Sequence, residues 1–432
     1  MAERPVTKGK RLFRLASMTA RVAGGYTKSK IKSVFQSSEA AEAERAEQHK
    51  RAGELIAQTL GELKGAVMKV GQMASIASDL LPKEIADALG VLQREAPPMD
   101  FEVIAEQIEK ELGAPPERLF HEFDREPFAS ASIGQVHRAR VDDGRQVVVK
   151  VQYPGVDDAV DSDLAHLKIA LKASGLVKMQ RKAIDAVFAE LKARLHEELD
   201  YCNEADNVRL FREYYEGHAQ VVVPAVVGER SSQRVLTLEY EPGDHVSEAG
   251  QYPIDVRNEI GATLFRVLAD QIFNFKKLHA DPNPANFAFR PDGKVVFYDF
   301  GCVKQLDPEI VDAYRDTVRA GLDEDYDGIE EGLMRLGARV PGTPRLPDDF
   351  IKQWRDLFLE PLVGPDPYDF STSAIQRKAL RYVPRSMKYL GSFQPPVELV
   401  FVDRVVVGHY GNLRALRVNA QYRSILEGHV RA

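Results

Sequence analysis

The sequence predicts an α+β protein with two lobes, one containing a small antiparallel β-sheet and a larger one that is mainly helical. Three observations support this prediction. The chain has 432 residues, which is too long for one small core. Short β-branched runs are concentrated in residues 117–242. Apolar residues at three- and four-residue steps dominate the regions before and after those runs, which indicates amphipathic helices.

Residues 1–37 are predicted to be a flexible basic segment. Its cations are Arg4, Lys8, Lys10, Arg11, Arg14, Arg21, Lys28, Lys30 and Lys32, and Glu3 is its one acid. A segment of this kind can lie on an anionic membrane with its apolar side chains in the lipid, so peripheral membrane contact is one expectation. The alternative is a solvated, poorly ordered tail.

Residues 38–116 are predicted to be a helical extension, because Ala, Glu, Leu and Lys dominate and apolar residues recur at helical spacing. Residues 117–242 are predicted to contain the sheet, with strands in LFHEFD, GQVHRARV and RQVVVKV. The Asp-Asp-Gly turn at 142–144 joins the last two strands. Helices at about 156–175 and 181–214 then precede the strands AQVVVPAVV and QRVLTLEY.

Residues 243–432 are predicted to form the helical lobe, with EYEPG at 239–243 as the crossover into it. A helix is expected over 253–278, and the chain is mainly helical again from 308 to its end. The order of elements is that of a protein kinase, but a fold alone does not establish a function.

Composition excludes several classes of protein. The net charge of -7 gives no global footprint for nucleic acid, so DNA and RNA are not expected partners. Cys202 and Cys302 are the only cysteines, so neither a disulfide framework nor a Cys-based zinc site is expected, and a cytoplasmic location fits. Asp403 and Arg404 interrupt the apolar stretch near residue 400, so no transmembrane helix is predicted.

The candidate catalytic and metal-binding residues lie in residues 278–301, LHADPNPANFAFRPDGKVVFYDFG. Asp281 and Asn286 have the H-x-D-x-x-x-x-N spacing of a kinase catalytic loop, and Asp299 begins an Asp-Phe-Gly motif after a strand-like run. Asn286 and Asp299 supply hard oxygen ligands of the kind that Mg²⁺ takes beside ATP. The alternative is ordinary Asx and proline turn chemistry, but the complete ordered set of residues favours phosphoryl transfer.

Lys150 is the predicted strand lysine that contacts the phosphates of ATP. A strand lysine is usually a solvated edge residue, but the valines before Lys150 indicate burial, and a buried ammonium needs a carboxylate partner. Glu204, in EELDYCNEADN, is the candidate for that partner.

Two features distinguish the chain from a conventional kinase. The loop ASASIGQVH, which begins with Ala129, Ser130, Ala131 and Ser132, stands where a Gly-rich phosphate loop is expected, and residues with a Cβ do not adopt the same positive-φ cradle. After the Asp-Phe-Gly motif, PEI follows almost at once, which leaves no room for a long activation segment. A protein substrate is therefore not expected.

These motifs together resemble those of the UbiB (AarF) family of atypical kinase-like ATPases linked to ubiquinone biosynthesis. The resemblance covers roughly residues 40–310 and includes KVGQ at 69–72, ASASIGQVH, VKVQYPGV, EELDYCNEADN, HADPNPAN and DFG. It implies that a helix carrying Lys69 and Gln72 folds over the nucleotide pocket. The two residues would then lie where a peptide substrate would otherwise enter. It also implies nucleotide-site roles for Glu198, Asp200 and Glu239.

The chain departs from the family pattern in two places. The catalytic loop reads DPNPAN where the family more often has D-P-H-P-G-N, and the C-terminus lacks the hydrophobic hairpin of some bacterial members. The expected function is Mg²⁺-dependent ATP hydrolysis or phosphoryl transfer to a small molecule. Quinone or isoprenoid-lipid precursors and their biosynthetic enzymes are the expected partners. A conventional Ser/Thr protein kinase and a nucleotide-regulated scaffold for lipid enzymes remain the alternatives.

Overall fold

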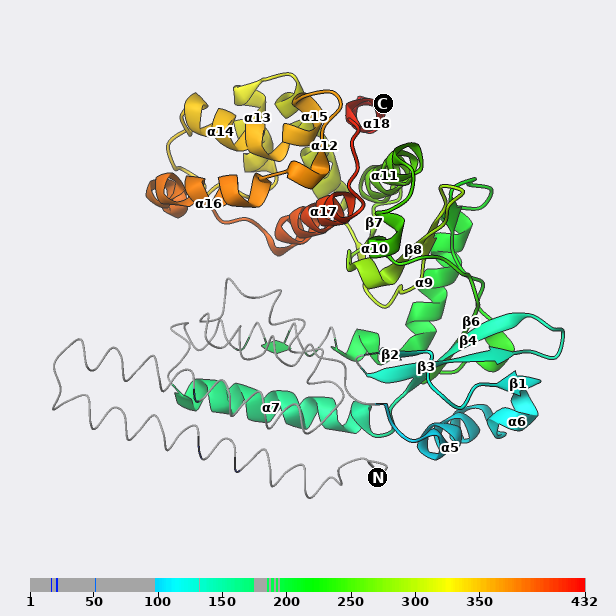
Figure 1. Cartoon of the computed structure of the whole chain (residues 1–432). Helices are drawn as coiled ribbons and strands as arrows, with labels where there is room; N and C mark the ends of the chain where they lie inside the picture. The colour runs from blue at the N-terminus through cyan, green and yellow to red at the C-terminus, as the bar shows by residue number, and fades with distance from the viewer. Residues whose placement is uncertain are drawn as a thin grey trace. The chain divides into compact units, whose positions relative to one another are not determined.

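The computed structural model describes residues 98–131, 133–174 and 195–431, together with residues 17, 21, 51, 185, 188, 189 and 192 (Figure 1). The basic N-terminal segment and the K-x-G-Q motif fall outside this part of the chain. The candidate residues Lys69, Gln72 and Ser132 also lie outside the described residues.

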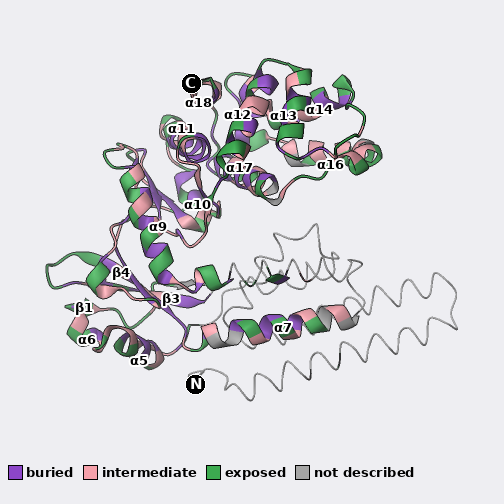
Figure 2. Cartoon of the chain, turned by 180° about the vertical axis from the view of Figure 1, so that it is seen from behind, coloured by how far each residue is buried: buried purple, intermediate pink, exposed green. Residues whose placement is uncertain are grey.

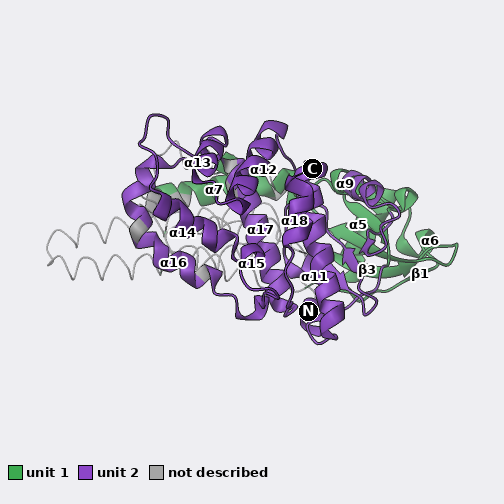
Figure 3. Ribbon diagram, turned by 90° about the horizontal axis from the view of Figure 1, so that it is seen from above, with its two compact units in different colours: residues 1–205, 226–240 green, residues 206–225, 241–432 purple. Residues whose placement is uncertain are grey.

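The chain divides into two compact units (Figure 3). Unit 1 comprises Met1–Ala205 and Val226–Tyr240, and unit 2 comprises Asp206–Ala225 and Glu241–Ala432. The helix α9, Tyr201–Tyr214, begins in unit 1 and continues in unit 2.

Unit 1 contains an antiparallel sheet in the order β1-β3-β4-β6, with β2 paired to β3. Its strands are β1 Glu122–Phe123, β2 Ala129–Ala131, β3 Gly134–Arg140, β4 Gln146–Gln152 and β6 Val235–Glu239. Val147, Val149 and Val151 are fully buried on one face of β4, so alternation along this strand separates the core from the opposite face. The predicted hairpin between β3 and β4 is confirmed, with Gly144 at a φ of 88° in its turn.

Unit 1 also contains the helices α5 Phe101–Leu112, α6 Pro116–Leu119 and α7 Val156–Ser174. Ile104 and Ile108 of α5 are fully buried. The prediction of a full strand over LFHEFD is wrong, because α6 occupies Pro116–Leu119 and only β1 remains extended. Pro116 at the first helical position favours this turn of helix.

Unit 2 contains two small sheets, β5-β9-β8 and β10-β7, followed by helices. The strands are β5 Val221–Val222, β7 Lys277–His279, β8 Phe287–Phe289, β9 Val295–Phe297 and β10 Val303–Gln305. The longer helices are α11 Ile254–Ala269, α12 Pro308–Leu322, α13 Tyr326–Arg335, α14 Asp348–Phe358, α16 Ile375–Ser386, α17 Val397–Ala415 and α18 Arg423–Val430. Figure 2 shows buried residues along α11 and α17, and this agrees with the positions of Leu264, Leu268 and Val405 in the core.

The predicted helix over 253–278 is too long. α11 ends at Ala269, a π-helical turn covers Asp270–Asn274, and the chain is already extended at Lys277. Lys276 has a φ of 52°, which reverses the chain direction and ends the helix. This reversal lets β7 pair with β10 and places His279 at the start of the catalytic loop.

Among the described residues, no helix combines the length and the apolar character that a bilayer crossing requires.

Candidate functional site

Lys150 and Glu204 form an ion pair within unit 1. Nζ of Lys150 lies 2.9 Å from both Oε1 and Oε2 of Glu204. The two side chains are 17% and 4% exposed, respectively. Lys150 lies on β4, opposite Val136 of β3 and Leu236 of β6, so it projects from a central strand of the sheet. A lysine in this position is held in place and is not a solvated edge residue.

The first turn of α9 orients Glu204. Oδ1 of Asp200 accepts a hydrogen bond from the backbone N of Cys202 at 3.0 Å, which places Asp200 at the start of the helix. The Tyr201 ring is buried beside the ammonium, with its centroid 4.9 Å from Nζ of Lys150. Glu198 precedes this turn and is partly buried.

The start of the Ala-rich loop pairs with β3. Ala129, Ser130 and Ala131 pair with Val136, Gln135 and Gly134, respectively, so the backbone is extended up to Ala131. A Cβ on Gly134 would overlap the carbonyl oxygen of Val151, so this glycine is needed for the close approach of β3 and β4. The loop is thus anchored by the sheet rather than being an open glycine-rich flap.

Glu239 ends β6 at the chain crossover. Its Oε1 accepts a hydrogen bond from Nη1 of Arg145 at 2.8 Å. The side chain is therefore engaged with the surface of the sheet, and a contact of Glu239 with nucleotide stays a prediction.

The catalytic-loop candidates lie in unit 2 on the turn that follows β7. Oδ1 of Asp281 accepts from the backbone N of Asn283 at 3.2 Å, and Nδ2 of Asn286 donates to the carbonyl oxygen of Asp281 at 3.2 Å. The second bond fixes the amide orientation and leaves Oδ1 of Asn286 as the atom suited to a cation. Both residues are partly exposed.

Asn283 and Ala285 stand where the family loop more often has His and Gly, and the local structure explains how both fit. Oδ1 of Asn283 accepts from the backbone N of Ala285 at 3.1 Å and caps the short 3₁₀ turn Pro284–Asn286. Asn283 thus stabilises the turn itself. Among the described non-glycine residues, φ is positive only at Lys276, Glu324 and Arg417, so Ala285 meets no conformational demand for glycine.

The Asp-Phe-Gly motif is fixed by buried neighbours within unit 2. Oδ1 of Asp299 accepts from the backbone N of Gly301 at 2.9 Å. Phe300 is fully buried, with its ring centroid 5.0 Å from that of Phe211. Nε2 of the buried His279 donates to the carbonyl oxygen of Asp299 and thereby connects the H-x-D and Asp-Phe-Gly motifs.

The sequence did not predict that α17 packs against the catalytic loop. Nδ2 of Asn412 donates to the carbonyl oxygen of Pro282 at 3.0 Å. A Cβ on Gly408 would lie 2.7 Å from Cβ of Pro282 and still closer to its Cγ, so α17 approaches the loop closely at this glycine. The only sign of this packing in the sequence was the pair Gly408 and Asn412, a glycine and a polar residue four positions apart in an apolar stretch.

Arg404 of α17 adds a cation near Asp281. Burial lowers the pKa of the Arg404 guanidinium, while the Asp281 carboxylate acts in the opposite direction. A kinase-like loop with a nearby fixed cation can stabilise negative charge on a phosphoryl group.

The oxygen donors of the site fit Mg²⁺. Asp299 and Asn286 supply a carboxylate and an amide oxygen, and Mg²⁺ commonly takes one or two protein ligands together with phosphate oxygens and water. No group of three or more His, Cys, Asp or Glu residues able to hold a metal ion occurs in the described ranges. One carboxylate and one amide oxygen would leave the remaining positions on Mg²⁺ to phosphate oxygens and water.

Comparison with known proteins decides the family. Residues 91–333 match the model of the ABC1 atypical kinase-like domain, and this range includes both the ion pair and the catalytic loop. The chain belongs to the ABC1 atypical kinase-like family. The resemblance to UbiB and AarF proteins that the motifs predict is confirmed.

Several relatives carry names of the same kind. The chain is 31% identical to the atypical kinase coq-8, mitochondrial, of Caenorhabditis elegans, with 82% of this chain and 48% of the relative covered. It is 29% identical to the atypical kinase COQ8B, mitochondrial, of Rattus norvegicus, with 87% and 71% covered. It is 35% identical to ACTIVITY OF BC1 COMPLEX KINASE 8, chloroplastic, of Arabidopsis thaliana, with 63% and 37% covered. The chain thus spans about a third to a half of several relatives that it matches.

A solved structure supports the fold. The Rv3197–erythromycin complex from Mycobacterium tuberculosis has a TM-score of 0.65 and 29% sequence identity to this chain. The match covers 91% of this chain and 98% of the other. The described part of the chain thus has a kinase-like ABC1 fold, with small sheets and mostly helical content, and the family match itself covers residues 91–333.

Proposed function

We propose that this ABC1-family chain binds ATP with Mg²⁺ and either hydrolyses it or transfers its phosphoryl group to a small molecule. The observation that carries this proposal is the two-oxygen contact of Lys150 with Glu204 on a central strand. A kinase uses this pair to hold its strand lysine toward the α- and β-phosphates of ATP.

Each candidate residue has a role in this proposal. Lys150 contacts phosphate, and Glu204 positions Lys150. Asp299 and Asn286 would hold Mg²⁺, which neutralises charge on the phosphates when it is bound. Asp281 orients the attacking hydroxyl group or water, and Arg404 provides positive charge beside it.

The remaining candidates stay proposals derived from the family. Lys69 and Gln72 would approach the nucleotide from the K-x-G-Q helix. Ala129, Ser130, Ala131 and Ser132 would cover its phosphates, while Glu198, Asp200 and Glu239 would line the site. The segment assignments 1–37, 38–116, 117–242 and 243–432 are proposed from the pattern of charge, apolar periodicity and β-branched runs in the sequence.

The short segment after the Asp-Phe-Gly motif supports a small acceptor or water over a protein acceptor. β10 ends at Gln305 and α12 begins at Pro308, so only Leu306 and Asp307 separate the two elements. A peptide-docking activation segment requires far more chain at this position.

The biological setting follows from the family. The UbiB resemblance and the coq-8 and COQ8B relatives support a role in quinone or isoprenoid-lipid metabolism, with lipid precursors or their enzymes as partners. The erythromycin complex of the structural relative supports the capacity of this fold to bind a large organic molecule. Peripheral membrane contact through the basic N-terminus is part of the same proposal.

Phosphate release from γ-labelled ATP tests the reaction type. The full chain is incubated with ATP and Mg²⁺, with EDTA, and with a generic protein acceptor such as casein. The expected result is slow Mg²⁺-dependent phosphate release without label on casein. Strong labelling of casein would instead support a conventional protein kinase, and nucleotide binding without any release would support a scaffold.

A further inference from the structure

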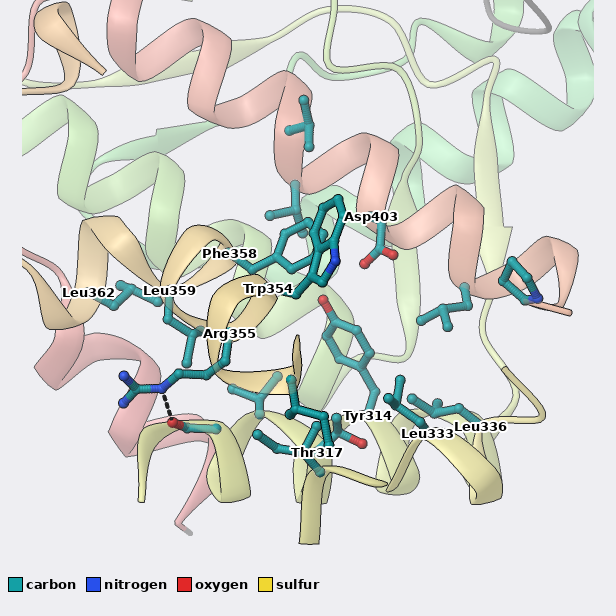
Figure 4. Close-up of a pocket in the computed structure, with 18 of the residues that line it drawn as sticks. Tyr314, Thr317, Leu333, Leu336, Trp354, Arg355, Phe358, Leu359, Leu362 and Asp403 are labelled. Atoms are coloured by element: carbon teal, nitrogen blue, oxygen red, sulfur yellow. Dashed lines mark hydrogen bonds between the residues drawn. The ribbon is translucent and has the colours of Figure 1, made fainter. Parts of the chain in front are cut away.

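A cavity of about 620 Å³ lies within the helical part of unit 2 (Figure 4). Its lining is mostly apolar and includes Phe273, Leu333, Trp354 and Phe358. No lining residue belongs to residues 277–305, which carry the catalytic-loop and Asp-Phe-Gly motifs. The cavity is therefore separate in sequence from these two motifs, whereas Asp403 in its lining neighbours Arg404 on α17.

Two polar side chains from different helices meet at this cavity. Tyr314 comes from α12 and Asp403 from α17, and the Tyr314 hydroxyl group interacts electrostatically with the Asp403 carboxylate. Figure 4 shows both side chains directed into the space between the helices. Burial raises the pKa of Asp403 to about 6, so the carboxylate is held in an apolar environment at a cost in free energy.

Arg355, Thr317 and Ser386 of the lining have hydrogen-bond partners inside the protein. Nε of Arg355 donates to the carbonyl oxygen of Gly321 at 2.7 Å, and Nη1 donates to Asp356 at 2.8 Å. Thr317 donates to the carbonyl oxygen of Ala313 at 2.7 Å, and Ser386 donates to that of Tyr382 at 3.0 Å. A carboxylate has about four acceptor sites, so Asp403 keeps acceptor capacity beside Tyr314 and is well suited to accept a hydrogen bond from a guest molecule.

We propose that this cavity binds a small, largely apolar molecule that carries one hydroxyl group. The hydroxyl group donates to Asp403, and the apolar body packs against Trp354 and Phe358. The volume falls within the range of about 300–1,000 Å³ that small-molecule sites occupy. An apolar molecule without a donor would remove the carboxylate from water without adding a hydrogen bond to it, and an anionic molecule would be repelled by it.

The site does not depend on the proposed nucleotide function. Trp354, Phe358 and Asp403 lie beyond residue 333, where the match to the ABC1 domain ends. A failure of ligand binding would therefore leave the nucleotide assignment intact, and a failure of nucleotide binding would leave the cavity intact.

Trp354 is the only tryptophan of the chain, so its fluorescence reports on this cavity directly. Bromine quenches tryptophan at contact distance, and the probe is therefore 11-bromo-1-undecanol, titrated below its solubility limit into the full chain. The matched control is 1-bromoundecane, which lacks only the hydroxyl group, and 11-bromoundecanoate supplies the anion. We expect saturable quenching by the alcohol, with an affinity about tenfold higher than that of the bromoalkane, and none by the anion.

Two variants locate the binding. Val318→Phe places a larger side chain in the lining and is expected to weaken quenching at least tenfold. Asp403→Leu is expected to remove the preference for the alcohol over the bromoalkane. Equal affinities of these two probes for the wild type, or quenching that rises linearly without saturation, would overturn the proposal even if neither variant folds.

Discussion

Lys150 of β4 and Glu204 of α9 are held together by two contacts of 2.9 Å between one ammonium and both carboxylate oxygens. The Glu204 side chain is only 4% exposed, so its charge is compensated by a partner and not by water. The ion pair therefore holds the Lys150 side chain in one position on a central strand of the sheet.

Glu204→Gln should weaken Mg·ATP binding at least tenfold, because Lys150 loses the charge that orients it. It should also lower the free energy of unfolding by about 2 kcal/mol, less than a fully buried pair costs, because Lys150 is partly exposed. Isothermal titration and urea unfolding measure the two effects. Glu102→Gln, which removes an exposed ion pair with Arg125, is the control and should change neither quantity appreciably. Unaltered ATP affinity in Glu204→Gln would contradict the assigned role.

Gly408→Ala should displace the catalytic loop, because the new methyl group would overlap Pro282. We expect ATP turnover to fall at least tenfold. Gly411→Ala is the matched control on the same helix, since no atom lies within 4 Å of its Cβ position. The control should retain activity and gain up to about 1 kcal/mol of stability from better helix propensity. Equal turnover in the two variants would exclude a positioning role for α17.

Arg404→Met should lower kcat for ATP turnover about tenfold while changing Mg·ATP affinity less than threefold. The reason is the loss of positive charge beside Asp281 at the point where the phosphoryl group reacts. Arg404→Lys should recover part of the rate, whereas Arg414→Met, an exposed position on the same helix, should behave as wild type. A large loss of affinity with unchanged kcat would assign Arg404 to ground-state binding instead.

The candidate catalytic residues could be selected from the sequence because their spacing is local. Asp281 and Asn286 are joined by one turn, and Asp299 follows a single hairpin. The contribution of α17 could not be read in this way, because Gly408 and Asn412 reach Pro282 from more than a hundred residues away. Only tertiary packing reveals such contacts.

The main strands and helices could also be predicted from the sequence, but some of their ends could not. Hydrophobic alternation identified β3 and β4, and helical periodicity identified α7 and the helices after residue 308. The end of α11 was missed, since the π-helical turn and the positive φ at Lys276 are backbone features that side-chain periodicity does not encode. The length of the strand β1 was overestimated, because the apolar residues of LFHEFD also fit the end of a helical turn followed by a bend.

His409 should make stability depend on pH. Burial lowers its pKa to about 3, with His279 adding to the effect, whereas the unfolded chain has a pKa near 6.5. The neutral buried form therefore contributes stability that is present above pH 6.5 and is lost as the pH falls toward 3. The difference in unfolding free energy between pH 7 and pH 4.5 should be about 2 kcal/mol smaller in His409→Gln than in the wild type. Urea unfolding measures this, with His121→Gln as the exposed control, and identical pH profiles for wild type and His409→Gln would rule the effect out.

The most direct test of the central claim is the thermal stabilisation of the full chain by Mg·ATP. A ligand at about 100 times its Kd stabilises the folded state by about 2.7 kcal/mol, which raises Tm by a few degrees. We predict that the wild type shows this rise with Mg²⁺ and that Asp299→Asn abolishes it, while the exposed Asp292→Asn retains it. A Mg²⁺-dependent rise in Asp299→Asn equal to that of the wild type would contradict the assignment of Asp299 to a nucleotide-bound metal.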